Sequence, residues 1–130
     1  MQEPEDERYR GLVVAESLQA GADIQLWEGS RLDRVQRVAI ADPAPGQPDT
    51  WTLLTVSLPA RFGPSFVAWL EQSLIAGPWY ADLDDSAHHY VVFSGRTFRY
   101  SLDDPEGPEE ARRYGRGLGI PRDQLDWDGP

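Results

Sequence analysis

Two short apolar segments on either side of Ser94-Gly95 constrain the fold more than any other feature of the sequence. The segments 89–93 and 96–101 are rich in β-branched and aromatic residues, which favour strands. The Ser-Gly pair between them is typical of a two-residue β-turn. The spacing therefore predicts an antiparallel hairpin in which Phe93 lies opposite Arg96.

The two faces of this hairpin differ in composition. Because side chains alternate along a strand, one face is expected to pack on a helix. It holds His89, Val91, Phe93, Arg96, Phe98 and Tyr100. The other face is amphipathic and is expected to be open to solvent, with His88, Tyr90, Val92, Thr97 and Arg99. A slip of one residue in the pairing would exchange the two faces.

Helix and strand signals follow in the rest of the chain. Apolar residues at helical spacing predict a helix over 64–76, with Pro64 in its first turn and Gly77 as its stop. A second helix is predicted to begin near Pro108 and to be capped by Gly119. Further strands are predicted over 12–15, 24–27, 35–40, 51–58 and 79–83, with a Pro-rich loop at 42–50.

The order of these elements predicts an α+β fold. Hairpin-length connections indicate two layers, with a mostly antiparallel sheet of about five to seven strands and two helices on one face. A length of 130 residues supports a single domain, placed at 11–127. The acidic segment 1–10 before it is expected to be a disordered tail.

Charge and cysteine usage exclude several classes of chemistry. The chain has 12 basic and 22 acidic side chains, a net charge of −10, and no Cys, so disulfides, thiolate nucleophiles and Cys-ligated metals are excluded. The negative charge repels nucleic acid and anionic membranes, so neither is expected as a partner. No signal peptide or long apolar run is visible, and a cytoplasmic location is expected.

No pattern in the sequence indicates catalysis or a cofactor. The G-x-S-x-G and S-x-x-K motifs are missing, and the Gly-rich segment 115–119 lies at a helix end rather than at a helix start. His88 and His89 are neighbours in a strand and should point to opposite faces, so they cannot chelate one metal together. We therefore expect no metal and no cofactor, and an enzyme is the less favoured alternative.

Two groups of residues are candidates for binding. A ligand pocket on the sheet would be lined by Trp79, His88, Tyr90 and Arg99. A protein-docking edge would combine basic residues of the second helix with an exposed aromatic anchor, namely Arg112, Arg113, Arg116 and Trp127. The alternative for these arginines is ion pairing within the chain, with Glu109, Glu110 and Asp103.

Several sequence strings also resemble a known group of proteins. They are Trp-Tyr-Ala-Asp at 79–82, Tyr-Val-Val-Phe-Ser-Gly-Arg-Thr-Phe-Arg-Tyr at 90–100, Tyr-Gly-Arg-Gly-Leu-Gly-Ile-Pro at 114–121 and Gln-Leu-Asp-Trp at 124–127. Together they resemble a group of small uncharacterised proteins of high-GC Gram-positive bacteria, closely over 79–127 and loosely over 51–58. The resemblance implies a cytoplasmic bacterial protein and brings no catalytic residues with it.

These observations favour a non-enzymatic protein-binding domain, such as an adaptor, an inhibitor or an immunity-type protein. The acidic charge, the 14 aromatic residues and the missing catalytic motifs motivate this hypothesis. Its partner would be another protein, and the chain would be a monomer or a weak dimer. The alternative is a small-ligand or enzymatic pocket around His88, Tyr90 and Arg99. Nucleic-acid mimicry is a third hypothesis and would need carboxylates spaced like phosphates along one surface.

Overall fold

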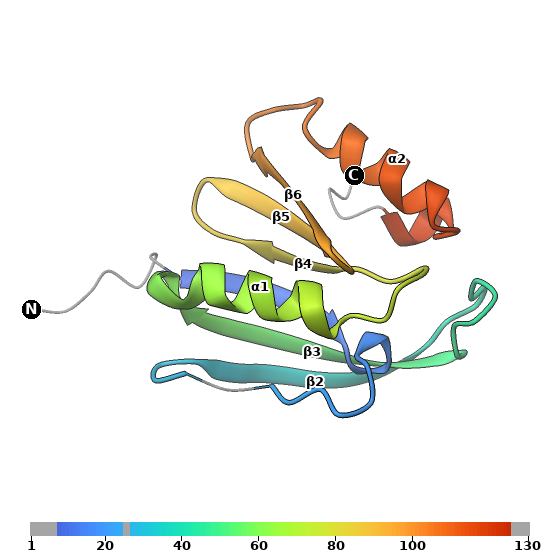
Figure 1. Ribbon diagram of the computed structural model, residues 1–130, viewed down its shortest axis with the longest axis horizontal. Coiled ribbons are helices and arrows are strands. Elements are labelled where there is room, and N and C mark those ends of the chain that lie inside the picture. Colours follow the sequence, from blue (N-terminus) through green and yellow to red (C-terminus); the bar gives the residue numbers. More distant parts are fainter. Residues whose placement is uncertain (1–7, 25–26, 126–130) are drawn as a thin grey trace, which may run out of the picture.

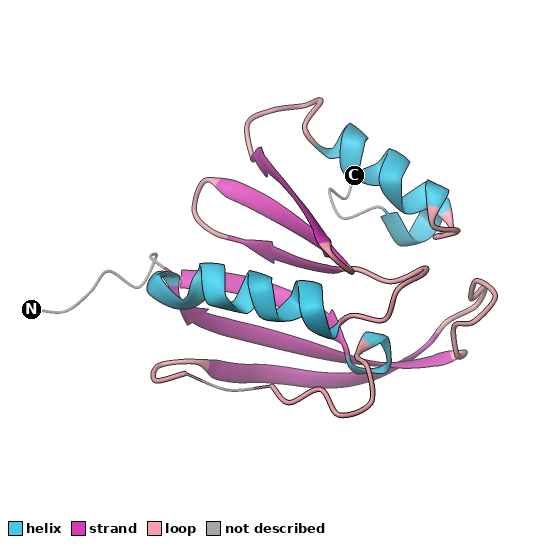
Figure 2. Ribbon diagram, in the orientation of Figure 1, coloured by secondary structure: helices cyan, strands magenta, loops and turns pink. Residues whose placement is uncertain are grey.

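The computed structural model describes residues 8–24 and 27–125. Six strands in this part of the chain form one open antiparallel sheet in the order β2-β3-β1-β4-β5-β6, with two α-helices packed against it (Figures 1 and 2). The strands are β1 (Arg8–Val14), β2 (Arg31–Ala39), β3 (Thr50–Pro59), β4 (Ala81–Asp84), β5 (His88–Phe93) and β6 (Arg96–Ser101). The helices are α1 (Gly63–Ser73) and α2 (Pro108–Gly117). The predicted α+β class is confirmed.

The hairpin predicted around Ser94-Gly95 forms in the predicted register. Phe93 pairs with Arg96, and His89 pairs with Tyr100. Gly95 has a φ of 74°, a left-handed conformation that glycine adopts without steric cost. The assignment of residues to the two hairpin faces is therefore confirmed as well.

The prediction that both helices lie on one face of the sheet is wrong. Val92 packs with Leu70 of α1, whereas its neighbour Phe93 packs with Ala111 of α2. Adjacent strand residues point to opposite faces, so the two helices cover opposite faces. The reason lies in β5 itself, because its uninterrupted apolar run 91–93 has to be covered on both sides. The hairpin face that was expected to be open thus carries α1.

Helix α1 ends earlier than the sequence predicted. It begins at Gly63 with Pro64 in the first turn, but Leu74 already has an extended conformation, with φ −71° and ψ 140°. Leu74 instead forms a β-bridge with Leu18 and is fully buried. Burial of this leucine under the sheet therefore ends the helix, and the predicted stop at Gly77 lies beyond it.

The N-terminal third departs most from the sequence prediction. Strand β1 already begins at Arg8, so residues 8–10 do not belong to the predicted tail over 1–10. The Tyr9 ring packs against the Tyr90 ring, with the two ring centroids 5.4 Å apart. Residues 1–7 lie outside the described residues. In the predicted strand 24–27, Ile24 and Trp27 belong to no strand, and residues 25 and 26 lie outside the described part of the chain.

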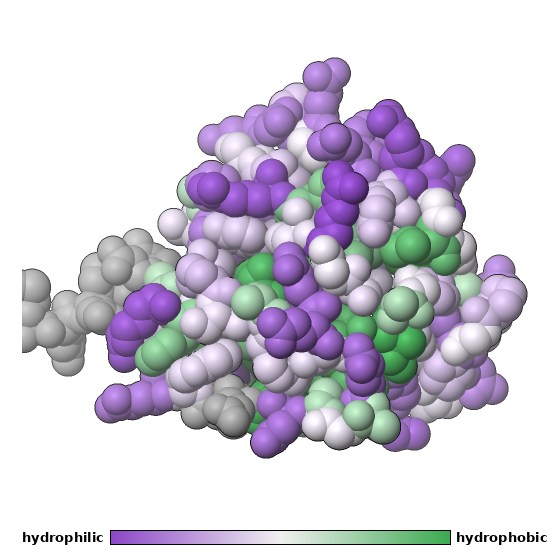
Figure 3. Space-filling model, in the orientation of Figure 1, coloured by the Kyte–Doolittle hydropathy of each residue, from purple (hydrophilic) through white to green (hydrophobic). Residues whose placement is uncertain are grey.

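Two apolar clusters hold the layers together. The larger cluster joins α1 to the sheet through Val13, Val56, Leu58, Phe66, Leu70, Leu74, Ala81, Leu83 and Val92. The smaller cluster joins α2 to β5 through Val91, Phe93, Ala111, Ile120 and Leu125. The face that carries α1 is largely hydrophilic, with smaller apolar areas between the polar side chains (Figure 3). No helix in 8–24 or 27–125 is long and apolar enough to cross a membrane.

Two glycines of the α2 region are expected to respond in opposite directions to alanine. A Cβ on Gly107, at the start of α2, would lie 2.6–2.7 Å from Cβ, Cγ and Cδ2 of Tyr100, whereas a Cβ on Gly117 meets nothing within 4 Å. Gly107→Ala should lower the free energy of unfolding by about 1–3 kcal/mol because Tyr100 must move. Gly117→Ala should raise it by a few tenths, up to about 1 kcal/mol, through helix propensity.

Urea unfolding followed by circular dichroism measures both glycine changes. Equal stability of the Gly107→Ala variant and the parent protein would contradict the close contact between α2 and Tyr100. A loss of stability on Gly117→Ala would contradict the open environment of that residue.

Candidate functional site

Half of the sheet is covered on one face only. The side chains of Leu12, Val14 and Leu53 point away from α1, because they alternate in register with Val13 and Leu54, which contact the α1 layer. Helix α2 covers this second face only around β5 and β6. No helix of residues 8–24 or 27–125 therefore lies on this apolar area over β1 and β3. Leu12, at its edge between Thr55 and Asp82, is 38% exposed.

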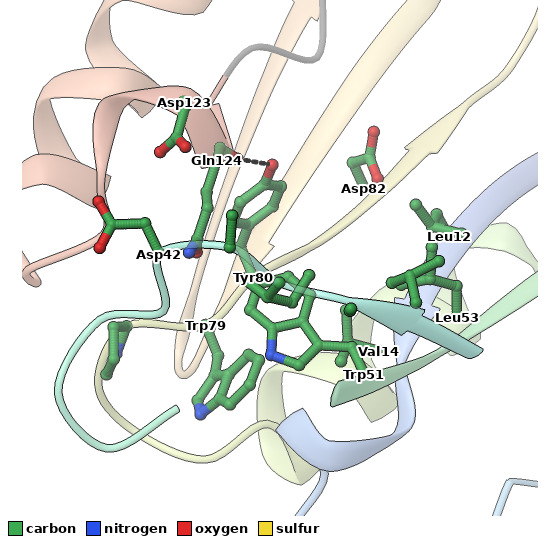
Figure 4. Close-up of a pocket in the computed structure, with 15 residues that line it drawn as sticks. Leu12, Val14, Asp42, Trp51, Leu53, Trp79, Tyr80, Asp82, Asp123 and Gln124 are labelled. Atoms are coloured by element: carbon green, nitrogen blue, oxygen red, sulfur yellow. Dashed lines mark hydrogen bonds between the residues drawn. The ribbon is translucent and has the colours of Figure 1, made fainter. Parts of the chain in front are cut away.

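This uncovered face leads into an aromatic cavity of about 370 Å³. Its walls include Trp51, Trp79 and Tyr80, and the ring centroids of the two tryptophans are 5.2 Å apart. Figure 4 shows these three rings together, with Leu12 and Leu53 of the uncovered face farther along the same cavity. The volume falls within the range of about 300–1,000 Å³ that is typical of ligand sites.

Hydrogen bonds to loop segments hold the cavity walls in place. Trp51 Nε1 donates to the Pro48 carbonyl at 2.9 Å, and the Tyr80 hydroxyl donates to the Gln124 carbonyl. The Gln47 and Gln124 side-chain amides bond to each other at 3.0 Å in both directions. Three segments that are distant in sequence are thus fastened together, so the cavity is formed before any ligand arrives.

Three carboxylates belong to the lining of the cavity. Asp42, Asp82 and Asp123 line it, and Asp42 and Asp123 also line a neighbouring hollow of about 820 Å³. The other charged residues of this hollow are Arg112, Arg116 and Arg122. Because the cavity and the hollow share two lining residues, they form one continuous surface that passes from aromatic rings to carboxylates and then to guanidinium groups.

The opposite end of the uncovered face is basic. Three arginines lie on the side of the sheet that faces away from α1. Ser57 pairs with Arg10 of β1 and with Arg31 of β2, and Thr55 pairs with Arg34 of β2. Carboxylates also lie on this side of the sheet, because Asp84 stands in register with Arg10 and Asp82 with Leu12.

Three of the four predicted ligand residues come together, but not at this cavity. Arg99 Nη2 lies 3.1 Å from His88 Nε2, and the Arg99 guanidinium lies 5.9 Å from the centre of the Tyr90 ring. They occupy the hairpin face that carries α1, beyond the start of that helix. Trp79, the fourth residue, is buried in the wall of the aromatic cavity on the other side of the sheet.

The polar groups of this hairpin cluster bond mainly to one another. The Tyr90 hydroxyl donates to Asp85 Oδ2 at 3.0 Å, and its pKa is raised by burial and by the hydrogen bonds with Tyr9 and Asp85. Burial acts to raise the pKa of Asp85, but hydrogen bonds from the Ala87 and His88 backbone amides outweigh it, and the pKa is lowered. This arrangement holds the β4–β5 turn against the hairpin.

His88 and His89 point to opposite faces, as predicted. His89 is 4% exposed, and both of its ring nitrogens are engaged, Nε2 with Asp82 Oδ2 at 3.1 Å and Nδ1 with the Tyr100 hydroxyl. These bonds connect β4, β5 and β6 under the start of α2. Among residues 8–24 and 27–125, no group of three or more His, Cys, Asp or Glu side chains is placed to hold a metal ion.

The predicted docking edge is divided by the structure. Arg112 and Arg116 line the hollow beside the cavity, and Arg112 Nε donates to the Leu125 carbonyl at 3.1 Å. Arg113 lies on the exposed side of α2 and does not line the hollow. Trp127, the predicted anchor, lies outside the described residues.

Sequence reasoning missed most of the cavity. The sequence predicts strands at Trp51 and Tyr80 but no site there, and no pattern marks Leu12 or Gln124 as a binding residue. One signal was present, because Leu53 lies on the side of its strand that Thr55 and Ser57 mark as polar. A large apolar residue on an otherwise polar strand face indicates a surface that something covers.

No family model, curated protein or solved structure matches the chain.

Proposed function

We propose that this chain is a non-enzymatic protein-binding domain whose docking surface is the uncovered sheet face together with the aromatic cavity. The observation that carries the proposal is the apolar area over β1 and β3, which no helix in the described part of the chain covers and which continues into a preformed cavity. Exposed apolar areas beside a pocket are characteristic of surfaces that bind other proteins.

The occupant that fits this surface is a segment of a partner protein with one large apolar side chain. Such a side chain would enter the cavity between Trp51 and Tyr80 and be shielded from water there. Aromatic-walled pockets at the centre of an interface carry most of its binding free energy. The rest of the segment would lie over Leu12 and Leu53.

Charge complementarity specifies the polar groups of that segment. Asp42, Asp82 and Asp123 at the cavity favour a basic group close to the anchor, because opposite charges fix the register of a docked chain. The arginines at the other end of the face favour acidic groups farther along the segment.

A selection from random displayed peptides against the full chain tests the proposal. Selected peptides should carry an aromatic or large aliphatic anchor with a basic neighbour. Leu12→Asp should weaken their binding by at least about tenfold, because it places a charge in the apolar area. Ile75→Asp is the matched control, since Ile75 is 37% exposed, as Leu12 is at 38%, and lies after α1, outside the cavity lining.

Titration calorimetry on folded variants provides the measurement. Equal affinities for the Leu12→Asp variant and the Ile75→Asp variant would contradict docking on this face. A selection that enriches no anchor-containing peptide would contradict it as well.

The volume of the cavity also favours a second candidate, a small ligand with an aromatic or aliphatic body. This version of the pocket hypothesis places the ligand beside Trp79 and not beside His88, Tyr90 and Arg99. The two candidates differ in the length of the ligand. A single amino-acid derivative that binds as tightly as the selected peptide would favour the small ligand.

We further propose that the interaction takes place in the cytoplasm of a bacterial cell, which is the location that the sequence resemblance implies. Expression of a tagged full chain in a high-GC Gram-positive host, followed by cell fractionation, tests this location.

A further inference from the structure

We infer that the docked segment ends at its anchor residue, so that the apolar side chain enters the cavity and the terminal carboxylate binds Arg116 and Arg122, beside Arg112. This inference rests on the proposed function and names the class of partner, a protein whose last residue is large and apolar. The inference gives the hollow beside the cavity a role in binding, whereas an apolar contact in the cavity would not involve the hollow.

The first support is the order of the surface. The uncovered strands, the cavity and the hollow follow one another in this order along the surface. The hollow is lined by α2, by the 3-10 helix Arg122–Leu125 and by Asp42. A chain that crosses the sheet and fills the cavity therefore reaches the hollow next. The backbone groups closest to an anchored side chain are the N–H and the carbonyl of its own residue, and the carbonyl becomes a negatively charged carboxylate only at a chain terminus.

The second support is the set of guanidinium groups. Arg112 and Arg116 are one helical turn apart on α2 and so share a face, and Arg122 approaches from the following 3-10 helix. Arg116 and Arg122 form no ion pair with any residue of 8–24 or 27–125. Guanidinium groups bind carboxylates through paired N–H donors, so this arrangement matches a terminal carboxylate.

The two carboxylates between the cavity and the hollow fit the same geometry. Asp42 and Asp123 belong to both lining sets, so they lie beside the backbone of an anchored residue. A carboxylate there can accept a hydrogen bond from the backbone N–H of that residue. The same carboxylates, Asp42 and Asp123, repel any anion that the guanidinium groups do not bind. A carboxylate of the ligand is therefore favoured only next to those guanidinium groups.

Three synthetic peptides test the inference on the full chain by two-dimensional NMR titration. The first is N-acetyl-Gly-Lys-Gly-Phe with a free carboxyl terminus, the second is its C-terminal amide, and the third is the amide of the same peptide extended by Gly-Glu. The free acid is expected to bind about fivefold tighter than the amide, and the difference should shrink with added salt. The extended peptide, with its acid on another residue, should bind like the amide.

Arginine variants identify the site of the carboxylate. Replacing Arg116 and Arg122 together with Gln should make the free acid and the amide bind equally. Arg113→Gln is the matched control, because Arg113 lies on the same helix outside the hollow, and it should preserve the difference.

The outcomes separate this inference from the proposed function. Equal binding of the free acid and the amide to the parent protein, with shifts of the Trp51 and Trp79 indole signals, would overturn the terminal carboxylate and leave the docking surface standing. Tighter binding of the Gly-Glu extension would also overturn it, in favour of an internal acidic residue. If no peptide shifts the indole signals, the proposed docking surface fails and the inference fails with it.

Discussion

Replacing Leu70 with alanine is expected to lower the free energy of unfolding by about 2–5 kcal/mol. Leu70 is 0% exposed at the centre of the cluster that joins α1 to the sheet, with Phe66 and Leu74 beside it on the helix side. Removing its side chain leaves a cavity between two rigid layers that cannot close fully. Since typical domains of this size are stable by only about 5–15 kcal/mol, the loss would be a large fraction of the total.

The control for this change is the same substitution at Leu32, which is 48% exposed on β2. Leu32→Ala should change the free energy of unfolding by no more than about 0.5 kcal/mol. Urea unfolding monitored by tryptophan fluorescence measures both variants. Similar losses at the two positions would mean that α1 is not the main apolar cover of its sheet face.

Replacing Trp51 with alanine is expected to weaken the binding of an anchor-containing peptide by at least about 2 kcal/mol, which is a loss of about thirtyfold in affinity. Trp51 forms one wall of the aromatic cavity and packs against Trp79, and its indole N–H donates a hydrogen bond to the Pro48 carbonyl. Without the ring, the cavity opens to solvent and no longer shields an inserted side chain from water.

A second variant separates lost binding from lost folding. Trp51→Phe keeps an aromatic wall but removes the hydrogen bond to Pro48, so it should retain a larger share of the affinity than alanine does. Titration calorimetry with the selected peptide measures affinity, and circular dichroism confirms that each variant is folded. A folded Trp51→Ala variant with unchanged affinity would exclude the cavity as the anchor site.

The hairpin was predictable because its determinants are local. A two-residue turn fixes which residues lie opposite one another, and Gly95 supplies the left-handed conformation that the turn requires. Strand β3 was also predicted almost to its ends, since alternation of Leu54, Val56 and Leu58 is a signal within a single segment. Short-range geometry of this kind does not depend on the rest of the chain.

The position of the helices was harder to predict because the sequence does not state which face each helix covers. The apolar run at 91–93 indicates a strand buried on both sides, but it does not say which helix lies on which side. The end of α1 was misplaced for a related reason. Leu74 is extended and forms a β-bridge with Leu18. No local sequence pattern predicts this contact, because the two residues are 56 positions apart.

The candidate site likewise contains a part that local patterns predict and a part that only distant contacts create. Local patterns brought out His88, Tyr90 and Arg99, which lie close together because they belong to one hairpin. The cavity instead combines β1, β2 and β3 with the segment before β4 and the last described helix. Hydrogen bonds such as the one between Gln47 and Gln124 span 77 residues, so they were beyond the reach of periodicity or spacing.

The sequence by itself determined the α+β class, the hairpin and its register, the absence of thiol chemistry and the presence of arginines on the second helix. Those properties follow from composition and from interactions between near neighbours in the chain. The tertiary structure alone decided that α1 and α2 lie on opposite faces and that neither of these helices covers one half of a sheet face. Burial is a property of the whole packed chain, because a residue is covered only when distant segments meet over it.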